Sequence, residues 1–113
     1  DTHHAINTEN IGLMKKGAYL LNCARGGLLE EKALLGALDS GHLAGAGIDV
    51  YEKEPAPTDH PYLNRPDIVA TPHIAGLTDV SKDKLWTIAI KQVIQGCQGE
   101  RPAHLLNPEM WKD

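Results

Sequence analysis

The sequence predicts an α/β domain in which helices flank a parallel sheet, and two observations carry this prediction. Apolar runs at 18–24 and 43–51 are nearly continuous, as expected for parallel strands that are buried on both faces. Helical patterns alternate with these runs, and with a shorter run at 67–71, through short connections that favour right-handed crossovers. Because three strands make a poor open sheet, we expect further strands upstream in a longer parent chain.

The first elements are expected to be a short helix and a strand. Asn7 or Thr8 can cap a helix that runs to about Lys15, and Gly17 ends it. The strand at 18–24 follows directly.

A second helix is expected over 30–41, where acidic residues occupy the first turn. Leu34, Leu35 and Leu38 form its apolar stripe, and a glycine supplies the C-terminal cap. The strand at 43–51 comes next, and its small residues let a helix or a cofactor approach closely.

The second half begins with an irregular segment at 52–66, which holds four of the seven prolines. Loops of this length in compact domains are usually functional or disordered. After the strand at 67–71, the apolar pattern predicts a long helix from about Thr78 to Gln98, with a face broad enough to pack on a sheet or a partner helix. The tail at 99–113 has no periodicity and is expected to be extended.

Composition excludes several classes of function. The chain has 113 residues, 42% hydrophobic and 23% charged, with a net charge of −4, so neither nucleic acid nor anionic lipid is a favoured partner. No apolar run approaches the roughly 20 residues needed to cross a membrane. Cys23 and Cys97 have no metal-ligand spacing and predict free thiols in a reducing compartment, the cytoplasm.

Polar residues follow each predicted strand at its carboxyl end. The segment 23–25 follows the first strand, Asp49 lies at the end of the second, and His73 follows the third. In open α/β sheets, ligands bind outside the carboxyl ends of the strands. We therefore expect a ligand site at this edge.

Each group there suits a chemical task. Arg25 carries a planar, permanently charged guanidinium group, which can bind a substrate carboxylate through two hydrogen bonds and polarise a carbonyl. His73 can deliver a proton to a developing alkoxide, and Glu54, on the irregular segment, could orient the imidazole and favour its charged form. Asp49 could accept a hydrogen bond from a cofactor amide, and Gly76 permits close approach of a ligand.

The same residues also admit structural interpretations. A histidine after a strand is more often a surface or core residue, and an arginine before Gly-Gly is most often a solvated turn residue. Asp49 could be a turn residue and Glu54 a loop charge. Cys23 could be a nucleophile, although the adjacent apolar run favours a buried or backbone-contacting thiol. His3 and His4 are expected to face solvent, and no metal site is assigned.

The order and spacing of these pieces resemble the D-isomer-specific 2-hydroxyacid dehydrogenase family. The resemblance runs from about Asn7 to Gly99 and takes in "MKKGAYLLNCARGGLLEEKALLGALDSGHLAGAGIDVYEKEP" and "DIVATPHIAG". It implies a Rossmann-type domain for NAD, with NADP possible, and hydride transfer to or from a 2-oxo/2-hydroxy acid (EC 1.1.1.-). Glu54 argues against the formate dehydrogenase branch, which has glutamine there. Phosphoglycerate, glyoxylate, hydroxypyruvate and lactate all remain open as substrates.

The resemblance also assigns site residues. The family's catalytic arginine, glutamate and histidine fall on Arg25, Glu54 and His73. Its cofactor contacts fall on Cys23, Ala24, Arg25, Asp49, His73, Ile74, Ala75 and Gly76. Of these, Asp49 is expected to meet the nicotinamide carboxamide.

Several features predict that the chain is part of a longer enzyme. The segment 1–10 has no initiator methionine, and no GxGxxG occurs, so the phosphate cradle is expected upstream. Residues 1–100 are interpreted as the C-terminal part of the NAD(P)-binding domain and 101–113 as a tail returning towards an absent substrate domain. The isolated chain is expected to bind NAD weakly and to be inactive. Relatives pair through this domain, which implies a homodimer.

Two other functions compete with this interpretation. Corepressor-like members of the same family keep the fold and act as nucleotide-sensing interaction proteins, and they can retain the same three residues. A Ser/His/Asp hydrolase using His73 and Asp49 is disfavoured, because there is no GxSxG elbow and neither Ser40 nor Ser81 sits at a sharp strand-to-helix turn.

Overall fold

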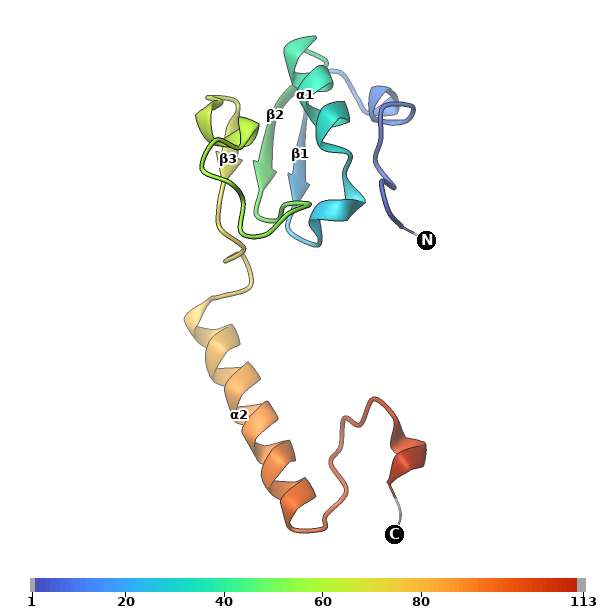
Figure 1. Ribbon diagram of the computed structural model, residues 1–113, viewed down its shortest axis with the longest axis vertical. Coiled ribbons are helices and arrows are strands. Elements are labelled where there is room, and N and C mark those ends of the chain that lie inside the picture. Colours follow the sequence, from blue (N-terminus) through green and yellow to red (C-terminus); the bar gives the residue numbers. More distant parts are fainter. Residues whose placement is uncertain (1, 112–113) are drawn as a thin grey trace. The chain divides into compact units, whose positions relative to one another are not determined.

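The computed structural model describes residues 2–111 (Figure 1). The chain divides into two compact units, Asp1–Ala75 and Gly76–Asp113. The first unit holds the sheet and the predicted site, and the second holds a long helix and the C-terminal tail.

Three parallel strands form the sheet of the first unit. They are β1 (Ala18–Asn22), β2 (Leu43–Ile48) and β3 (Ile68–Ala70), arranged in that order across the sheet. The last residues of all three strands lie level with one another, because Ile48 pairs with both Asn22 and Ala70. The predicted α/β class with a parallel sheet is thereby confirmed, and the segments that leave the sheet at this edge start side by side.

One helix covers a face of this sheet. It is α1 (Glu31–Asp39), which connects β1 to β2 (Figure 1). Leu34 and Leu38 are buried against the core that Leu20 and Ile48 build from the strands, whereas Leu35 is only partly buried. Burial of each full leucine side chain contributes roughly 1.5–3 kcal/mol, so this small aliphatic core fixes the orientation of the helix on the sheet.

The other face of the sheet is open in this unit. Tyr19, Leu21 and Val69 are 70%, 73% and 71% exposed, while Leu20 between them is buried. The prediction of strands buried on both faces is therefore wrong for β1, whereas four of the six residues of β2 are buried. The apolar sequence of these strands indicates a covered face, but the segments of residues 2–75 cover one face alone.

The predicted helix from Asn7 or Thr8 to Lys15 is also wrong. The structure has a single 3-10 turn there, Ile11–Leu13. Asn7 accepts hydrogen bonds from the backbone N–H groups of Glu9 and Asn10, and the Asn10 side chain accepts one from Asn7 N–H. Short polar side chains of this kind compete with the helical hydrogen bonds, which explains why the helix does not form.

The irregular segment at 52–66 is packed rather than loose. It contains a 3-10 helix, Pro61–Asn64, in which Tyr62 is 2% exposed. His60 is also buried, and its Nε2 lies 3.1 Å from a carboxylate oxygen of Glu31 at the start of α1. The ring of Tyr51 packs edge-on against that of His60, so this segment forms one end of the core.

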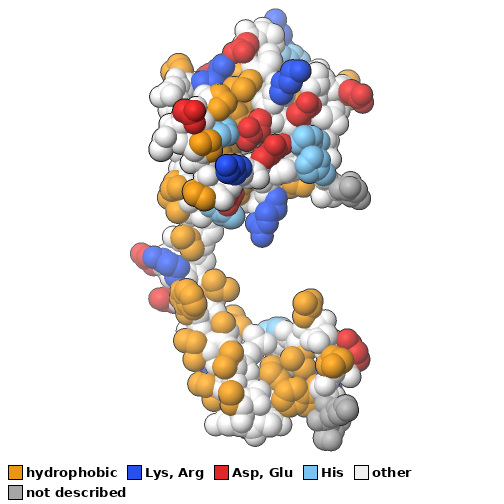
Figure 2. All heavy atoms as spheres, in the orientation of Figure 1, with side chains coloured by type: hydrophobic (Ala, Val, Ile, Leu, Met, Phe, Trp, Pro, Cys, Tyr) orange, Lys and Arg blue, Asp and Glu red, His pale blue; other side chains and the backbone are white. Residues whose placement is uncertain are grey.

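The second unit is built around α2 (Asp79–Cys97), within one residue at each end of the predicted helix. Thr78 and Ser81 form a capping box, in which each side chain hydrogen-bonds the other's backbone N–H. None of the residues of α2 is buried, and apolar side chains lie along it (Figure 2). In the described part of the tail, residues 99–111, the one regular element is a 3-10 turn, Pro108–Met110. Among the described residues, no helix has the length and hydropathy needed to cross a membrane.

Candidate active site at the edge of the sheet

The candidate site lies where the three parallel strands end. Residues 23–25 leave β1, Asp49 leaves β2 directly, and residues 71–75 leave β3. Glu54 reaches the same edge from the loop after β2, because its carboxylate contacts His73. Asp49, Glu54 and residues 73–75 contact one another at this edge, and the charge of Arg25 acts on Glu54. Gly76 belongs to the second unit. The predicted cofactor contacts of Cys23, Ala24 and Gly76 stay predictions.

His73 and Glu54 form a hydrogen-bonded pair, which is an ion pair whenever the imidazole is protonated. Nδ1 of His73 lies 2.7 Å from Oε2 of Glu54, and the two side chains are 46% and 35% exposed. The other oxygen of Glu54 accepts a hydrogen bond of 3.0 Å from the backbone N–H of Tyr51. Both hydrogen bonds lower the pKa of the Glu54 carboxyl, the one with His73 more than the one with Tyr51, and the charge of Arg25 adds to the effect. Glu54 is therefore held ionised beside the imidazole.

The backbone at His73 is strained. Its φ is 56°, in the left-handed region that few residues other than glycine adopt. Such conformations cost about 1–3 kcal/mol and persist where the surroundings fix them. The next two residues are fixed here, since Ile74 and Ala75 donate backbone hydrogen bonds of 2.8 and 2.9 Å to Asp49.

Asp49 is the anchor of this turn. It is 2% exposed, and its Oδ1 also accepts a hydrogen bond of 2.5 Å from the hydroxyl of Thr71. Burial raises the pKa of Asp49, but the hydrogen bonds from Thr71, Ala75 and Ile74 together outweigh it, so the pKa is lowered. An ionised carboxylate thus holds the segment on both sides of His73. The predicted contact of Asp49 with a cofactor stays a prediction.

Arg25 lies on the neighbouring loop, which Asn22 shapes from the end of β1. The Asn22 side chain donates to the carbonyl of Arg25 at 3.0 Å and accepts from the N–H of Ala24 at 3.2 Å. The Arg25 side chain is exposed and donates to the carbonyl of Ala24 at 2.6 Å. Cys23 is also exposed, so of the two structural alternatives for its thiol the buried one is wrong, and the backbone-contacting one stays a prediction.

The next residue, Gly26, joins this loop to the loop that carries Glu54. A Cβ on Gly26 would lie 2.0 Å from the backbone carbon and oxygen of Tyr51. Only glycine allows so close an approach of two backbones. The position of Arg25 relative to Glu54 therefore depends on the absence of a side chain in glycine at position 26.

A pocket of about 580 Å³ opens beside the ion pair. Glu54, Thr71 and His73 line its polar side, and apolar residues such as Leu63 and Ala70 line the remainder. A larger cavity of about 840 Å³ lies beside α1, but it holds none of the predicted site residues. We place the candidate site at the smaller pocket, because Glu54 and His73 line it and lie at the edge where the parallel strands end.

Sequence reasoning missed three positioning residues. Asn22 shapes the Arg25 loop, Thr71 binds Asp49, and Tyr51 holds Glu54 through its N–H while its hydroxyl donates to the carbonyl of Thr71 at 3.1 Å. The signal for Thr71 and Asn22 was available, because both are polar residues at the ends of otherwise apolar strands.

Comparisons with known proteins agree with this geometry. Residues 1–75 match the family described as "D-isomer specific 2-hydroxyacid dehydrogenase, NAD binding domain". A glyoxylate reductase from Thermofilum pendens is 41% identical over 112 residues, which cover 99% of this chain and 33% of the relative. The chain spans between about a fifth and about a third of the length of the curated relatives it matches.

Solved structures show the same fold. A D-lactate dehydrogenase with NAD+ from Lactobacillus jensenii is 29% identical and superposes with a TM-score of 0.84, over 93% of this chain and 36% of that one. A D-isomer specific 2-hydroxyacid dehydrogenase from Xanthobacter autotrophicus Py2, in complex with NADPH and MES, is 30% identical with a TM-score of 0.75, over 98% of this chain and 45% of that one. Together with the match over residues 1–75, these likenesses confirm the Rossmann-type fold and show that the chain belongs to the D-isomer specific 2-hydroxyacid dehydrogenase family, as part of its NAD-binding domain.

Proposed function

We propose that this chain is part of an NAD(P)-dependent oxidoreductase that interconverts 2-oxo acids and D-2-hydroxy acids. The ion pair between His73 and Glu54 is the observation that carries the proposal. A carboxylate-bound imidazole, half-exposed beside a pocket at the edge of a parallel sheet, is suited to transfer a proton to a substrate oxygen. A nearby exposed arginine, Arg25, supplies the charge that a 2-oxo acid requires.

In the direction of reduction, His73 gives its proton to the carbonyl oxygen of the substrate as that oxygen gains charge. Glu54 orients the ring through Nδ1, which leaves Nε2 directed away from the carboxylate. Arg25 binds the substrate carboxylate and polarises the neighbouring carbonyl. In the reverse direction, His73 takes the proton back from the hydroxyl group.

The residues fit one end of a dinucleotide. Cys23, Ala24 and Arg25 on one loop and His73, Ile74, Ala75 and Gly76 on the other are proposed to contact the nicotinamide end. Asp49 would accept a hydrogen bond from the nicotinamide carboxamide, through the carboxylate lone pair that its present hydrogen-bond partners do not use. When bound, the nicotinamide supplies or accepts the hydride. No GxGxxG for the pyrophosphate lies in these 113 residues. The residue that meets the ribose, and with it the choice between NAD and NADP, is proposed to belong to the remainder of the parent protein.

The organisation of the parent protein is proposed on the same basis. Residues 1–100 would complete the NAD(P)-binding domain, and residues 101–113 would return towards the substrate domain. The isolated chain would then bind NAD weakly and be inactive. Unpaired cysteines favour a cytoplasmic location, and the apolar side chains of α2 favour a homodimer.

The test is turnover by the full-length parent protein with NADH and NADPH against glyoxylate, hydroxypyruvate, pyruvate and phosphohydroxypyruvate. His73→Asn is the variant of choice, because asparagine tolerates the left-handed backbone but cannot carry the proton. His104→Asn, an exposed histidine in the second unit, is the matched control. We expect one acid to be reduced by the parent and by the control but not by His73→Asn.

The outcome also separates the proposal from its alternative. If the parent binds NADH but reduces none of the acids, the dehydrogenase proposal is wrong. A nucleotide-sensing interaction protein, of the corepressor-like kind, would then be the better interpretation.

A further inference from the structure

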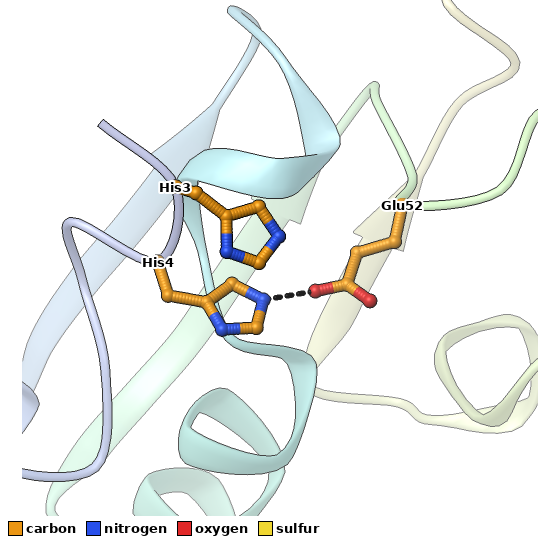
Figure 3. Close-up of side chains that lie close together, drawn as sticks. All are labelled: His3, His4 and Glu52. Atoms are coloured by element: carbon orange, nitrogen blue, oxygen red, sulfur yellow. Dashed lines mark hydrogen bonds and ion pairs between the residues drawn. The ribbon is translucent and has the colours of Figure 1, made fainter. Parts of the chain in front are cut away.

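Three potential metal ligands meet on the first unit, outside the site described above. They are His3 and His4, from the start of the chain, and Glu52, from the loop after β2 (Figure 3). One ligand atom from each lies within 4.8 Å of the others. Nε2 of His4 already contacts Oε1 of Glu52 at 2.5 Å, across 48 residues of sequence. The sequence alone predicts no metal here, because nothing in it links Glu52 to the two histidines.

The backbone is shaped so that the two imidazoles lie together. Neighbouring residues of an extended chain point in opposite directions. His4, however, has a φ of 51°, and its ring stacks on that of His3 with the centroids 3.9 Å apart. The turn is held by hydrogen bonds from His4 N–H to the carbonyl of Gly27, at 2.7 Å, and from Asn7 to the carbonyl of His4, at 3.0 Å.

Glu52 is held by the same part of the chain. Its backbone nitrogen would lie 2.4 Å from a Cβ on Gly26, and a Cβ on Gly27 would lie 3.4 Å from the ring of His3. The preceding residue, Tyr51, is 6% exposed and anchored in the core. Both sides of the cluster therefore rest on the turn Gly26–Leu28, so their separation is set by packed backbone.

The donor set defines the kind of metal. Two imidazole nitrogens and one carboxylate oxygen suit zinc and its first-row neighbours, whereas magnesium and calcium prefer oxygen ligands alone. We propose that His3, His4 and Glu52 bind a divalent first-row transition metal, for which Zn²⁺ is the reference ion. The side chains of His4 and Glu52 are 34% and 40% exposed, which leaves room for water as a fourth ligand.

Metal binding would rearrange the cluster locally. The stacked rings, now 29° from parallel, must rotate about their side-chain bonds so that their nitrogen lone pairs converge. The contact between His4 and Glu52 is then replaced by metal–ligand bonds of about 2.0–2.2 Å. The site is separate from the proposed chemistry, because Glu54 and not Glu52 contacts His73. The proposal does not depend on the proposed function.

Calorimetric titration of the tag-free chain with Zn²⁺ alone tests the site. We expect one Zn²⁺ per chain, with binding weakened at least about tenfold in His4→Asn and Glu52→Gln, as for losses around known metal ligands. Asparagine is chosen because it tolerates the left-handed backbone of His4. His104→Asn and Glu100→Gln, both exposed, are the matched controls and should bind as the wild type does.

A second measurement uses the wild-type chain only, so it does not depend on the folding of a variant. Substoichiometric Co²⁺ should broaden the imidazole NMR signals of His3 and His4 before those of the other four histidines, His42, His60, His73 and His104. Broadening of another histidine first would overturn the proposal. Equal Zn²⁺ affinity in the wild type, His4→Asn and Glu52→Gln would overturn it as well, since the ion would then bind surface histidines only.

Discussion

His73 and Glu54, 19 residues apart in the chain, are joined by a contact of 2.7 Å between Nδ1 and Oε2. An ionised carboxylate can only accept a hydrogen bond, so Nδ1 must donate. The opposite ring atom, Nε2, is then the one that can face a substrate, and the side chain is 46% exposed. The ion pair thus gives the imidazole a defined orientation before any ligand binds.

The first prediction concerns this orientation. Glu54→Gln keeps the size of the side chain but removes its charge, so Nδ1 of the imidazole loses the charged acceptor that orients the ring. In the parent enzyme we expect kcat to fall, within the roughly 10²–10⁴-fold that general acid–base catalysis contributes, while KM changes little. Steady-state kinetics with the accepted 2-oxo acid measure both constants.

Glu100→Gln is the control for this variant, because Glu100 is exposed and lies in the second unit. An unchanged kcat in Glu54→Gln would mean that the ion pair has no part in the chemistry.

The second prediction concerns Gly26, which brings the loop of Arg25 against Tyr51. Gly26→Ala places a Cβ 2.0 Å from two backbone atoms of Tyr51, and neither can move without shifting the buried end of β2. We expect the free energy of unfolding to fall by about 1–3 kcal/mol or more. Urea denaturation of the isolated chain, followed by circular dichroism, measures it.

Gly12→Ala is the matched control, since no atom lies within 4 Å of the Cβ position at Gly12. It should change the free energy of unfolding by no more than about 0.5 kcal/mol. Equal effects of the two substitutions would show that the Gly26 contact does not constrain the loop.

The third prediction concerns the pH dependence of stability through Asp49. Its pKa in the folded chain is below its ordinary value of 3.8, so the ionised carboxylate stabilises the fold at every pH above that value. This contribution is lost as the pH falls below 3.8 and through the lower pKa of the folded state. We expect the melting temperature of the wild type to drop in this range.

Asp49→Asn tests the assignment. The amide nitrogen of the new side chain would face a backbone N–H whose hydrogen bond Asp49 now accepts. Because two donors then face each other, the variant should have a lower melting temperature than the wild type at pH 7. The difference should shrink as the pH falls below 3.8, because wild-type Asp49 then becomes protonated. A difference that stays constant between pH 7 and pH 3 would contradict the role of the charge.

The features that depend on local residue patterns, or on the topology of a parallel sheet, could be predicted from the sequence. The helix α2 and the strands were predicted because their apolar patterns are continuous and their ends carry capping or glycine residues. The meeting of Asp49, Glu54 and the turn at His73 followed from the rule that ligand sites form where parallel strands end. The contact of Glu54 with the imidazole of His73 was expected and is present. The hydrogen bonds from Ile74 and Ala75 to Asp49 were not, because they depend on side-chain geometry that no pattern encodes.

Other features could not be predicted, for identifiable reasons. The short helix near Asn7 failed because side-chain hydrogen bonds replaced the helical ones. The cluster of His3, His4 and Glu52 joins residues 48 positions apart through a turn whose shape depends on a left-handed histidine. The open face of the sheet could not be predicted either, because an apolar strand pattern does not show which face the described residues cover.

The last prediction concerns association through α2. No residue of this helix is buried, and Leu85 and Trp86 are 61% and 63% exposed, so a large apolar surface faces solvent. Exposed patches of this kind usually mark an interface. If α2 pairs with a second copy, gel filtration of the chain should show a dimer that dissociates on dilution. Trp86→Lys should shift the equilibrium to the monomer, and Thr87→Lys should have a smaller effect because it removes no apolar side chain. A monomer at every concentration would assign this surface to the remainder of the parent protein instead.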